Sequence, residues 1–513
     1  MTTTARGSLI LSFAQRYAIL AIRLVALVVL SRLLTPVELG YYVAASAIVS
    51  LGQVLADCGT AQFIVQSRAL TRSTEQTALG AGLVTSCVAA AAVLTVSFLA
   101  PSALMPAEIR TSAQILVVTL LLYPFSNLAS AVLQREMRFG ELAWISIAAA
   151  LGSVATSIAL AMAGASFMSL VWGTVIEAAI TTTLLLRSHR LVFPSLADWR
   201  AFLDFGWIWS SINGLRQISD ASVRLSVGAL LGLGAVGLMS RAQNVMLLFD
   251  KLLLDALGPV LLPTLAGRLR DGREVKAVHM RMIACVSATA WAFFSVLALC
   301  ADPFVRLMLG PQWLDAIAPI RILCIGGLFM PFSGLALQYF LALGTLRSYL
   351  PYHAVVQAAK AVLVAAASTI SLELACLALV TEPALKGIFA QRLLEQHLGS
   401  ARKDGRHGLC GSAAASIAAF AAAALAYSAI DSAAPPLLVL VACAGAALPA
   451  WLAALLLTKH PLIDELRHAL SLAQANLRRA AHAHDSHGRG ASREHATLRE
   501  TSRGAQSRIG EDP

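Results

Sequence analysis

The chain has 513 residues, of which 58% are hydrophobic and only 13% are charged, and its formal net charge is +11. Soluble domains carry roughly 25% charged residues, and one water-soluble core cannot hide this much apolar surface. The composition therefore excludes an ordinary soluble protein, and because the basic residues sit between apolar segments and in the tail, membrane topology explains them better than nucleic-acid binding.

Apolar segments separated by short polar joints follow one another along the chain. A membrane-spanning helix needs about 20 residues, and about fourteen segments reach that length. They cover roughly 9–33, 39–63, 77–99, 113–134, 141–163, 166–186, 203–227, 232–258, 278–300, 316–342, 353–371, 374–392, 409–430 and 435–457. The segments 353–371 and 374–392 share a very short turn near Glu373, and the second of them carries Glu382, Pro383 and Lys386. A count of twelve or thirteen spans therefore stays open. We expect an all-α integral membrane protein.

Arginine and lysine gather in every second joint. The even-numbered joints hold Arg68, Arg72, Arg135, Arg138, Arg187, Arg190, Arg200, Arg268, Arg270, Arg273, Lys276, Arg347, Arg392, Arg402, Lys403 and Arg406. The odd-numbered joints offer little beyond Arg110 and Arg306, with Arg32 near the end of the first span. Because cytoplasmic loops carry the excess of basic residues, we expect both termini in the cytoplasm. The first apolar run has spanning length and no cleavage site, so we expect no cleaved signal peptide.

Two short phrases recur in the same order in the two halves of the chain. Residues 124–129 (Pro-Phe-Ser-Asn-Leu-Ala) return at 331–336 (Pro-Phe-Ser-Gly-Leu-Ala), an offset of 207 (331 − 124). Residues 33–40 return at 230–237, an offset of 197 (237 − 40). Because six spans separate the copies, both halves enter the membrane in the same direction, as parallel repeats about a central cavity. Chance similarity of leucine- and alanine-rich text is the alternative for either match alone.

The repeats divide the chain into four parts. We expect a six-helix lobe over 1–190, a second six-helix lobe over 200–395, two additional spans over 405–458, and a basic cytoplasmic tail over 459–513. The tail has few large apolar residues, so it is predicted to be largely disordered.

Charged residues inside the predicted spans are candidates for the walls of a cavity, because a lipid-facing charge at mid-bilayer costs about 2.5 to 3.5 kcal/mol. Arg16 and Arg23 lie seven residues apart and share one face of the first span. Arg216, Asp220 and Arg224 form a charged stripe on the seventh span. Two alternatives stay open: Arg16 reaches back to the cytoplasmic surface, or the stripe neutralises itself as a structural ladder.

Carboxylates in the spans are candidates for ion coupling. Asp57 and Glu177 have few neighbouring charges in the sequence, and Asp220 belongs to the stripe. The competing interpretation of Asp57 and Glu177 is a buried carboxylate satisfied by hydrogen bonds. Further ionisable residues lie in or near the spans: Asp250, Lys251, Asp255, Arg321 and Lys360.

Several phrases resemble a known superfamily. They are 31–40 (Ser-Arg-Leu-Leu-Thr-Pro-Val-Glu-Leu-Gly), 55–59, 63–66, 133–139, 237–242 (Gly-Leu-Met-Ser-Arg-Ala) and 309–314. Their order and spacing are similar to Wzx-like exporters, the polysaccharide-transport branch of the multidrug/oligosaccharidyl-lipid/polysaccharide (MOP) flippase superfamily. The resemblance covers about residues 9 to 395. Met239 departs from it, standing where the family usually has an aromatic residue, and the twelfth span is unusually polar.

The resemblance implies a V of two six-helix lobes and a flippase in the bacterial inner membrane. Its substrate would be a polyprenyl-pyrophosphate-linked oligosaccharide, an O-antigen or exopolysaccharide unit, moved to the periplasmic leaflet by alternating access. Arg23, Arg216 and Arg224 would bind phosphate or acidic sugar, since the guanidinium fork pairs two phosphate oxygens, and Arg16 would assist at the entrance. We expect no enzymatic activity, no cofactor and no metal. Transport would be coupled to a proton or sodium gradient. The expected partners are membrane lipid, a polysaccharide polymerase and other export-assembly proteins.

Three rival functions stay open. A cation-coupled multidrug antiporter of the same superfamily would want an anionic cavity. A membrane polysaccharide polymerase or ligase usually has a large periplasmic loop between spans, whereas no odd-numbered joint of this chain exceeds about 20 residues. A lipid II flippase would be distinguished by an essential gene. We interpret the Gly232-x-Gly234-x-x-Gly237 pattern as a tight turn with close helix packing and not as a nucleotide site, and the tail histidines His482, His484 and His487 as solvated residues.

Overall fold

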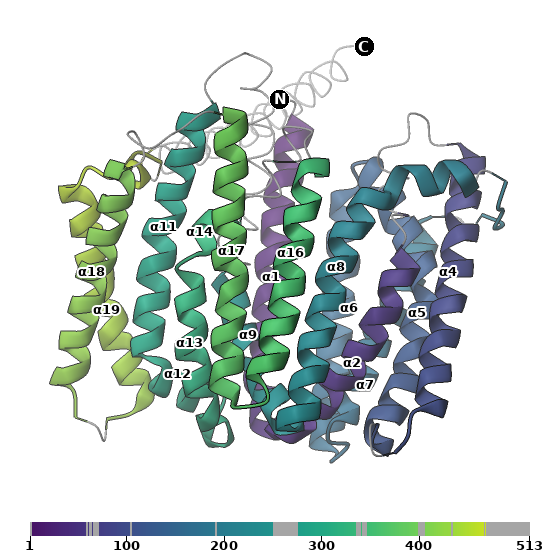
Figure 1. Cartoon of the computed structure of the whole chain (residues 1–513), viewed down its shortest axis with the longest axis horizontal. Coiled ribbons are helices and arrows are strands. Elements are labelled where there is room, and N and C mark those ends of the chain that lie inside the picture. Colours follow the sequence, from purple (N-terminus) through teal and green to yellow (C-terminus); the bar gives the residue numbers. More distant parts are fainter. Residues whose placement is uncertain are drawn as a thin grey trace, which may run out of the picture.

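The computed structural model describes residues 3–57, 60, 64, 71–102, 105–189, 192–197, 199–249, 275–334, 340, 346–398, 406–431, 434–465 and 467. Every regular element in these ranges is a helix, which confirms the all-α prediction for the part of the chain that they cover. The helices stand side by side in one bundle, with α4 and α5 at one edge and α18 and α19 at the other (Figure 1).

The first half contributes α1 (Thr3–Leu33), α2 (Pro36–Asp57), α4 (Arg72–Leu99), α5 (Ala107–Arg135), α6 (Phe139–Met162) and α7 (Met168–Ser188). The second half contributes α8 (Trp199–Leu231), α9 (Leu233–Phe249), α11 (Val275–Leu299), α12 (Ala301–Met308), the 3₁₀ helix η2 (Pro311–Ala316), α13 (Ile317–Gly327), α14 (Met330–Ser333), α16 (Leu346–Ala367) and α17 (Leu372–Leu398). Two further helices follow, α18 (Arg406–Ala429) and α19 (Pro436–Leu457).

Nine helices of the described residues are long and apolar enough to cross a membrane. They are α2, α4, α5, α6, α7, the His279–Leu299 part of α11, the Arg347–Ala367 part of α16, α18 and α19. Each of the fourteen predicted spans coincides with helical residues, but α1, α8, α9, α13, α14 and α17 fall outside the nine, so the count of fourteen stays a prediction. The long helices α8 and α17 contain charged residues that the sequence singled out, Arg216, Asp220 and Arg224 on α8 and Glu382 and Lys386 on α17.

The turn between α1 and α2 shows how the Thr-Pro-Val-Glu phrase acts locally. Thr35 caps α2: its Oγ1 accepts a hydrogen bond from the Glu38 backbone N–H at 3.3 Å, and Glu38 Oε2 accepts one from the Thr35 N–H at 2.7 Å. This reciprocal capping box satisfies two backbone donors at the start of the helix, and Pro36 suits the first helical position. Ser166, just before α7, donates a further hydrogen bond to Glu38.

The two halves repeat the same helix pairings. In the first half, α1 packs against α6, α2 against α5, and α5 against α7. In the second half, the helices at the corresponding places pair in the same way: α8 with α16, α9 with α13, and α13 with α17. The division of the sequence into two parallel copies thus has a counterpart in the packing.

The halves meet where α2 and α9 cross near their N-termini. A Cβ on Gly40 would lie 2.0 Å from the Leu233 carbonyl oxygen, and a Cβ on Gly237 would lie 1.9 Å from the Pro36 carbonyl oxygen. These contacts are reciprocal, since Leu233 follows Pro36 and Gly237 follows Gly40 by the same 197 residues. Only glycine permits such backbone approach. This confirms that the Gly232-x-Gly234-x-x-Gly237 pattern is a turn with close packing, and Gly232 itself has φ of 90°.

The largest apolar core surrounds this crossing and extends into the second half. It joins Val43 of α2 with Met239 and Phe249 of α9, Phe294 of α11 and Trp313 of η2. Met239 is fully buried here, where its flexible apolar side chain fills the core.

The additional helices α18 and α19 pack against each other and against α11 and α12. His460, just beyond α19, is buried and pins this pair: its Nε2 lies 3.1 Å from the Gly408 carbonyl oxygen and 3.0 Å from Ser412 Oγ. Its Nδ1 accepts a hydrogen bond from the Leu462 N–H at 3.1 Å. Most of the predicted tail, with His482, His484 and His487, lies outside the described residues.

Candidate functional site

A cavity of about 590 Å³ lies in the second half of the molecule. Five charged residues line it: Arg216, Asp220 and Arg224 of α8, and Glu382 and Lys386 of α17. Ser240, Gln243 and Asn244 of α9 add hydroxyl and amide groups, while Phe294, Leu323, Met330 and other residues of α11, α13 and α14 supply apolar walls. A polar, charged chamber between helices of this hydropathy can accommodate a charged or strongly polar ligand.

The charged stripe predicted on the seventh span is on the wall of this cavity. Arg216, Asp220 and Arg224 follow one another at intervals of four residues, so one face of α8 presents all three. Arg216 Nη1 lies 3.5 Å from Asp220 Oδ2, and the two side chains are 51% and 35% exposed. This contact is long and open to solvent, so Arg216 is only weakly held by its carboxylate.

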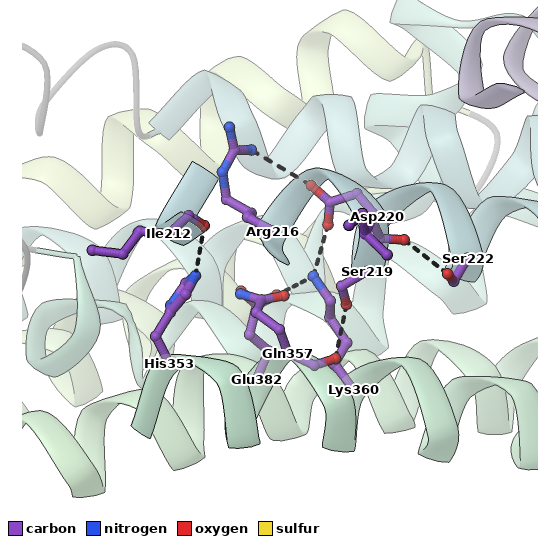
Figure 2. Close-up of polar contacts among 10 residues, drawn as sticks. Ile212, Arg216, Ser219, Asp220, Ser222, His353, Gln357, Lys360 and Glu382 are labelled. Carbon is purple, nitrogen blue, oxygen red and sulfur yellow. Dashed lines mark hydrogen bonds and ion pairs between the residues drawn. The ribbon is translucent and has the colours of Figure 1, made fainter. Parts of the chain in front are cut away.

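Asp220 has a stronger and more deeply buried partner, Lys360 of α16 (Figure 2). The Lys360 ammonium lies 2.7 Å from Asp220 Oδ1 and 3.1 Å from Glu382 Oε2, and its side chain is 2% exposed. One ammonium therefore joins carboxylates from two different helices, α8 and α17. From the sequence, Lys360 is only a further ionisable residue without an identified partner.

Hydrogen bonds hold the helices around this cluster in register. Gln357 Nε2, one turn before Lys360, donates to Glu382 Oε1 at 3.0 Å. Ser219 Oγ donates to the Gln357 carbonyl oxygen at 2.9 Å, and His353 Nε2 donates to the Ile212 carbonyl oxygen at 3.1 Å (Figure 2). Both hydrogen bonds join α8 to α16, and these two helices carry Arg216, Asp220 and Lys360.

The first half holds a simpler arrangement. Arg23 Nη2 of α1 lies 3.0 Å from Glu177 Oε1 of α7, with the side chains 52% and 37% exposed. Glu177 is therefore not the isolated carboxylate expected from the sequence, because a cation 154 residues away in the chain pairs with it. One turn earlier on α7, Thr174 Oγ1 lies 2.9 Å from the Tyr42 hydroxyl.

Asp57 stands at the C-terminal end of α2, apart from both clusters. Its Oδ1 accepts a hydrogen bond from the Tyr123 hydroxyl of α5 at 2.9 Å. It forms no ion pair with any of the residues that the structure describes. Arg16 lies in α1, but its side chain is outside the described part of the structure, as are Asp250, Lys251 and Asp255.

The repeat explains why the two clusters differ. Glu382 follows Glu177 by 205 residues (382 − 177), between the two sequence offsets of 197 and 207, and Asp220 follows Arg23 by 197 (220 − 23), the offset of the copy that α1 and α8 run into. In the first half the corresponding residues Arg23 and Glu177 pair with each other. In the second half Lys360 occupies Glu382 instead. Asp220, at the place of Arg23, is bound by the same ammonium. One turn further along α8, Arg224 forms no ion pair within the described residues and lines the cavity.

Comparison with known proteins places the chain in a family. A model of the polysaccharide biosynthesis protein family matches residues 29–318. The lipopolysaccharide biosynthesis protein WzxC of Escherichia coli K12 is 22% identical over 315 residues, which are 60% of this chain and 64% of WzxC. An uncharacterized membrane protein in the cps region of Klebsiella pneumoniae is 20% identical over 315 residues, 60% of this chain and 65% of that protein. The alignments thus span just under two thirds of either relative.

Solved structures agree on the fold. The lipid II flippase MurJ, in an inward closed conformation, superposes with a TM-score of 0.68 at 12% identity over 87% of this chain and 97% of that one. An inward-facing multidrug resistance transporter of the MOP superfamily gives 0.60 at 14% identity, over 77% and 99%. At these identities the likeness concerns the fold, and it confirms the predicted multi-pass transporter architecture. The resemblance to Wzx-like proteins is confirmed as well: the chain belongs to the polysaccharide biosynthesis protein family, with the fold of the MOP flippase superfamily.

Proposed function

We propose that the protein is a flippase that carries a polyprenyl-pyrophosphate-linked oligosaccharide, an O-antigen or exopolysaccharide unit, from the cytoplasmic to the periplasmic leaflet of the bacterial inner membrane. The observation that carries the proposal is the cavity lined by Arg216 and Arg224, whose two carboxylates are already engaged by Lys360. Such a chamber favours an anionic guest. The polar headgroup would cross inside it, while the prenyl chain stays in lipid.

The roles of the arginines follow from their partners. Arg224 has no carboxylate among the described residues, and Arg216 holds Asp220 only at 3.5 Å, so both can turn to phosphate at little cost. We assign them the headgroup, with Ser240, Gln243 and Asn244 as hydrogen-bonding groups for sugar. Arg23 is neutralised by Glu177 and contributes less. Arg16 would act near the entrance, if the termini face the cytoplasm as the basic joints predict.

Energy coupling is assigned to Asp57. Of the three carboxylates that the sequence proposed for coupling, Glu177 pairs with Arg23 and Asp220 with Lys360 and Arg216. Asp57 has only the neutral Tyr123 hydroxyl as a partner among the described residues, so it is the one best suited to take up and release a proton or a sodium ion. Asp57→Asn is expected to abolish the dependence of export on the ion gradient.

The alternative of a multidrug antiporter would need a free carboxylate in the cavity for a cationic drug. Both carboxylates there are bound by Lys360, which argues against it. A lipid II flippase would also carry a pyrophosphate, and it is distinguished by genetics: deletion of the gene is expected to remove a surface polysaccharide and leave the cells viable. The relatives are flippases and transporters, which agrees with transport and not enzymatic catalysis. The polysaccharide polymerase and other assembly proteins are expected partners on the periplasmic side.

The proposal is tested by surface polysaccharide output in a deletion strain that expresses single variants at equal membrane level. We expect Arg224→Ala to lower output at least about tenfold, because a charge-assisted hydrogen bond contributes about 1.5 to 3 kcal/mol and 1.4 kcal/mol is a factor of ten. Arg216→Ala should act in the same direction. Arg306→Ala is the matched control, since Arg306 is bound to Asp302 at 3.0 Å on α12, away from the cavity. Normal output from both cavity variants would refute the assignment.

A further inference from the structure

Two phrases of the sequence, residues 31–40 of the first half and 309–314 of the second, meet at one backbone carbonyl. The Ser31 carbonyl oxygen accepts a hydrogen bond from Gln312 Nε2 at 2.5 Å and another from Trp313 Nε1 at 2.7 Å. Both bonds run from η2 of the second half to the end of α1. None of these three residues lines the cavity, so the contact has a role other than holding the cargo.

The local sequence leaves the Ser31 carbonyl available to these two donors. Ser31 lies in the last turn of α1, where the N–H four residues further on, that of Thr35, would normally bond to it. The capping box of α2 takes this N–H, which donates to Glu38 Oε2 at 2.7 Å. Ser31 is fully buried, so its carbonyl needs a donor from within the protein. The second half supplies two.

The second half also holds both donors in place. Gly310 follows α12 with φ of 103°, a conformation that glycine adopts readily, and Pro311 begins η2. This sharp turn brings Gln312 and Trp313 together at the start of η2. The Trp313 side chain is fully buried, and the Arg241 guanidinium of α9 lies 5.0 Å from its ring centroid. The indole whose N–H reaches α1 is therefore fixed on its face as well.

These bonds lie where the two halves approach each other most closely. Arg32 Nη2 adds a third bond between the halves, to the Leu307 carbonyl oxygen of α12 at 2.8 Å. Figure 1 shows α12 at the end of the bundle opposite the N-terminus, the end that the basic joints predict to be periplasmic. Ser240 of the cavity wall lies one turn beyond Gly237 of the glycine crossing. Separation of the halves here would open the cavity toward this end.

We propose that Gln312 and Trp313 are positioning residues of the transport cycle, which latch the end of α1 to the second half and hold the predicted periplasmic side closed. The latch has to open before the halves can separate at this end. Water can bond to the Ser31 carbonyl once the halves part, so opening requires neither helix to unfold. The direction of transport rests on the proposed function, whereas the latch itself is a contact that needs no substrate.

The test measures how often the halves part in the purified full-length protein without substrate. Val43 of α2 is buried against α9, so in Val43→Cys a water-soluble maleimide reaches the thiol only when the halves separate. Labelling is followed by mass spectrometry, with the native Cys443, fully buried between α18 and α19, as an internal reference. We expect Gln312→Met combined with Trp313→Phe to raise the labelling rate at position 43 about tenfold and to leave Cys443 unchanged, because two hydrogen bonds are lost while the bulk of both side chains is kept.

Trp291→Phe is the matched control. Trp291 Nε1 also donates to a backbone carbonyl, that of Leu328 at 2.8 Å, but both residues belong to the second half. This variant should keep the labelling rate at position 43 within about twofold of the rate in Val43→Cys alone. An acceleration as large as that of the latch variant would show that loss of any buried indole bond has this effect, and would overturn the proposal.

Two further outcomes would also overturn it. One is a labelling rate at position 43 that the double variant leaves unchanged, and the other is an equal acceleration at position 43 and at Cys443, which would indicate general destabilisation. Should the double variant fail to reach the membrane, Gln312→Met alone and Trp313→Phe alone decide the matter, each with an expected acceleration of about threefold at position 43. None of these results depends on the polysaccharide output of the arginine variants, so failure of the latch and failure of the proposed function are distinguishable.

Discussion

The two halves of this protein keep the same backbone contacts but use their charges differently. Gly40 and Gly237 make reciprocal contacts across the interface, as repeated units related by a twofold axis would. The charges do not follow that symmetry. Arg23 and Glu177 balance each other in the first half, while in the second half Lys360 joins Asp220 and Glu382 at the corresponding positions. The same places thus hold an arginine–carboxylate pair in one half and two carboxylates with a lysine in the other, and Arg224, one turn further along α8, lines the cavity.

The largest effect that would sharpen this comparison is expected at Lys360. Replacing Lys360 by Met removes a buried ammonium from two carboxylates that are 35% and 25% exposed. Breaking a fully buried ion pair costs about 3 to 5 kcal/mol and an exposed one about 0 to 1 kcal/mol, so we expect a loss of about 2 to 4 kcal/mol in thermal unfolding of the detergent-purified protein. A change below about 1 kcal/mol would mean that the carboxylates do not depend on the ammonium, and the contrast between the halves would disappear.

The next effect concerns the symmetry itself. Gly40→Val and Gly237→Val each place a side chain against backbone at 2.0 and 1.9 Å, where no flexible group can move aside. Overpacking costs about 1 to 3 kcal/mol and occasionally more, and we expect the two variants to lie at the upper end and to resemble each other. Gly445→Val is the control, because no atom lies within 4 Å of a Cβ there. Unequal losses from the two crossing variants would break the reciprocity.

A smaller, pH-dependent effect is expected where α18 and α19 are attached, a feature of the second half only. Burial lowers the pKa of His460 below its usual 6.5, and its Nδ1 must be unprotonated to accept from the Leu462 N–H. The stabilisation is therefore complete above about pH 6.5 and is lost as the pH falls through the lowered pKa of the folded state. The melting temperature should fall by more between pH 7 and pH 5 in the native protein than in His460→Gln. Parallel pH profiles would exclude this role.

The smallest effect is expected at the first-half pair. With side chains 52% and 37% exposed, the Arg23–Glu177 contact is a solvent-screened ion pair worth about 0 to 1 kcal/mol. A double-mutant cycle of Arg23→Ala and Glu177→Ala, followed by thermal unfolding, should give a coupling energy in that range. A coupling of 3 kcal/mol or more would make the first half as dependent on its charges as the second.

The sequence predicted the fold well, because hydropathy marks spans directly and charged joints and repeated phrases need no partner to be recognised. It also predicted that the Arg216, Asp220 and Arg224 face lines a cavity, since helical spacing alone places three residues on one face. The polar twelfth span was identified as a departure from the family, and its Glu382 and Lys386 do line that cavity.

Pairings between helices could not be predicted in the same way. Periodicity shows which face a residue occupies but not which residue of another helix meets it. Arg23 meets Glu177 across 154 residues and Lys360 meets Asp220 across 140. The sequence therefore described Glu177 as a lone carboxylate and gave Lys360 no partner. Aligning the two repeats residue by residue would have matched Glu177 with Glu382. It would not have shown that Lys360 pairs with Glu382.

The central claim is that Arg224, which lines the cavity and forms no ion pair within the described residues, is the anion-binding residue of the second half. It is tested most directly by calorimetric titration of the purified protein with inorganic pyrophosphate, comparing Arg224→Gln with Arg23→Gln. We predict that Arg224→Gln weakens binding at least about tenfold, whereas Arg23→Gln changes it less than about threefold. Equal affinities for the native protein and Arg224→Gln, or a larger loss in Arg23→Gln, would contradict the account.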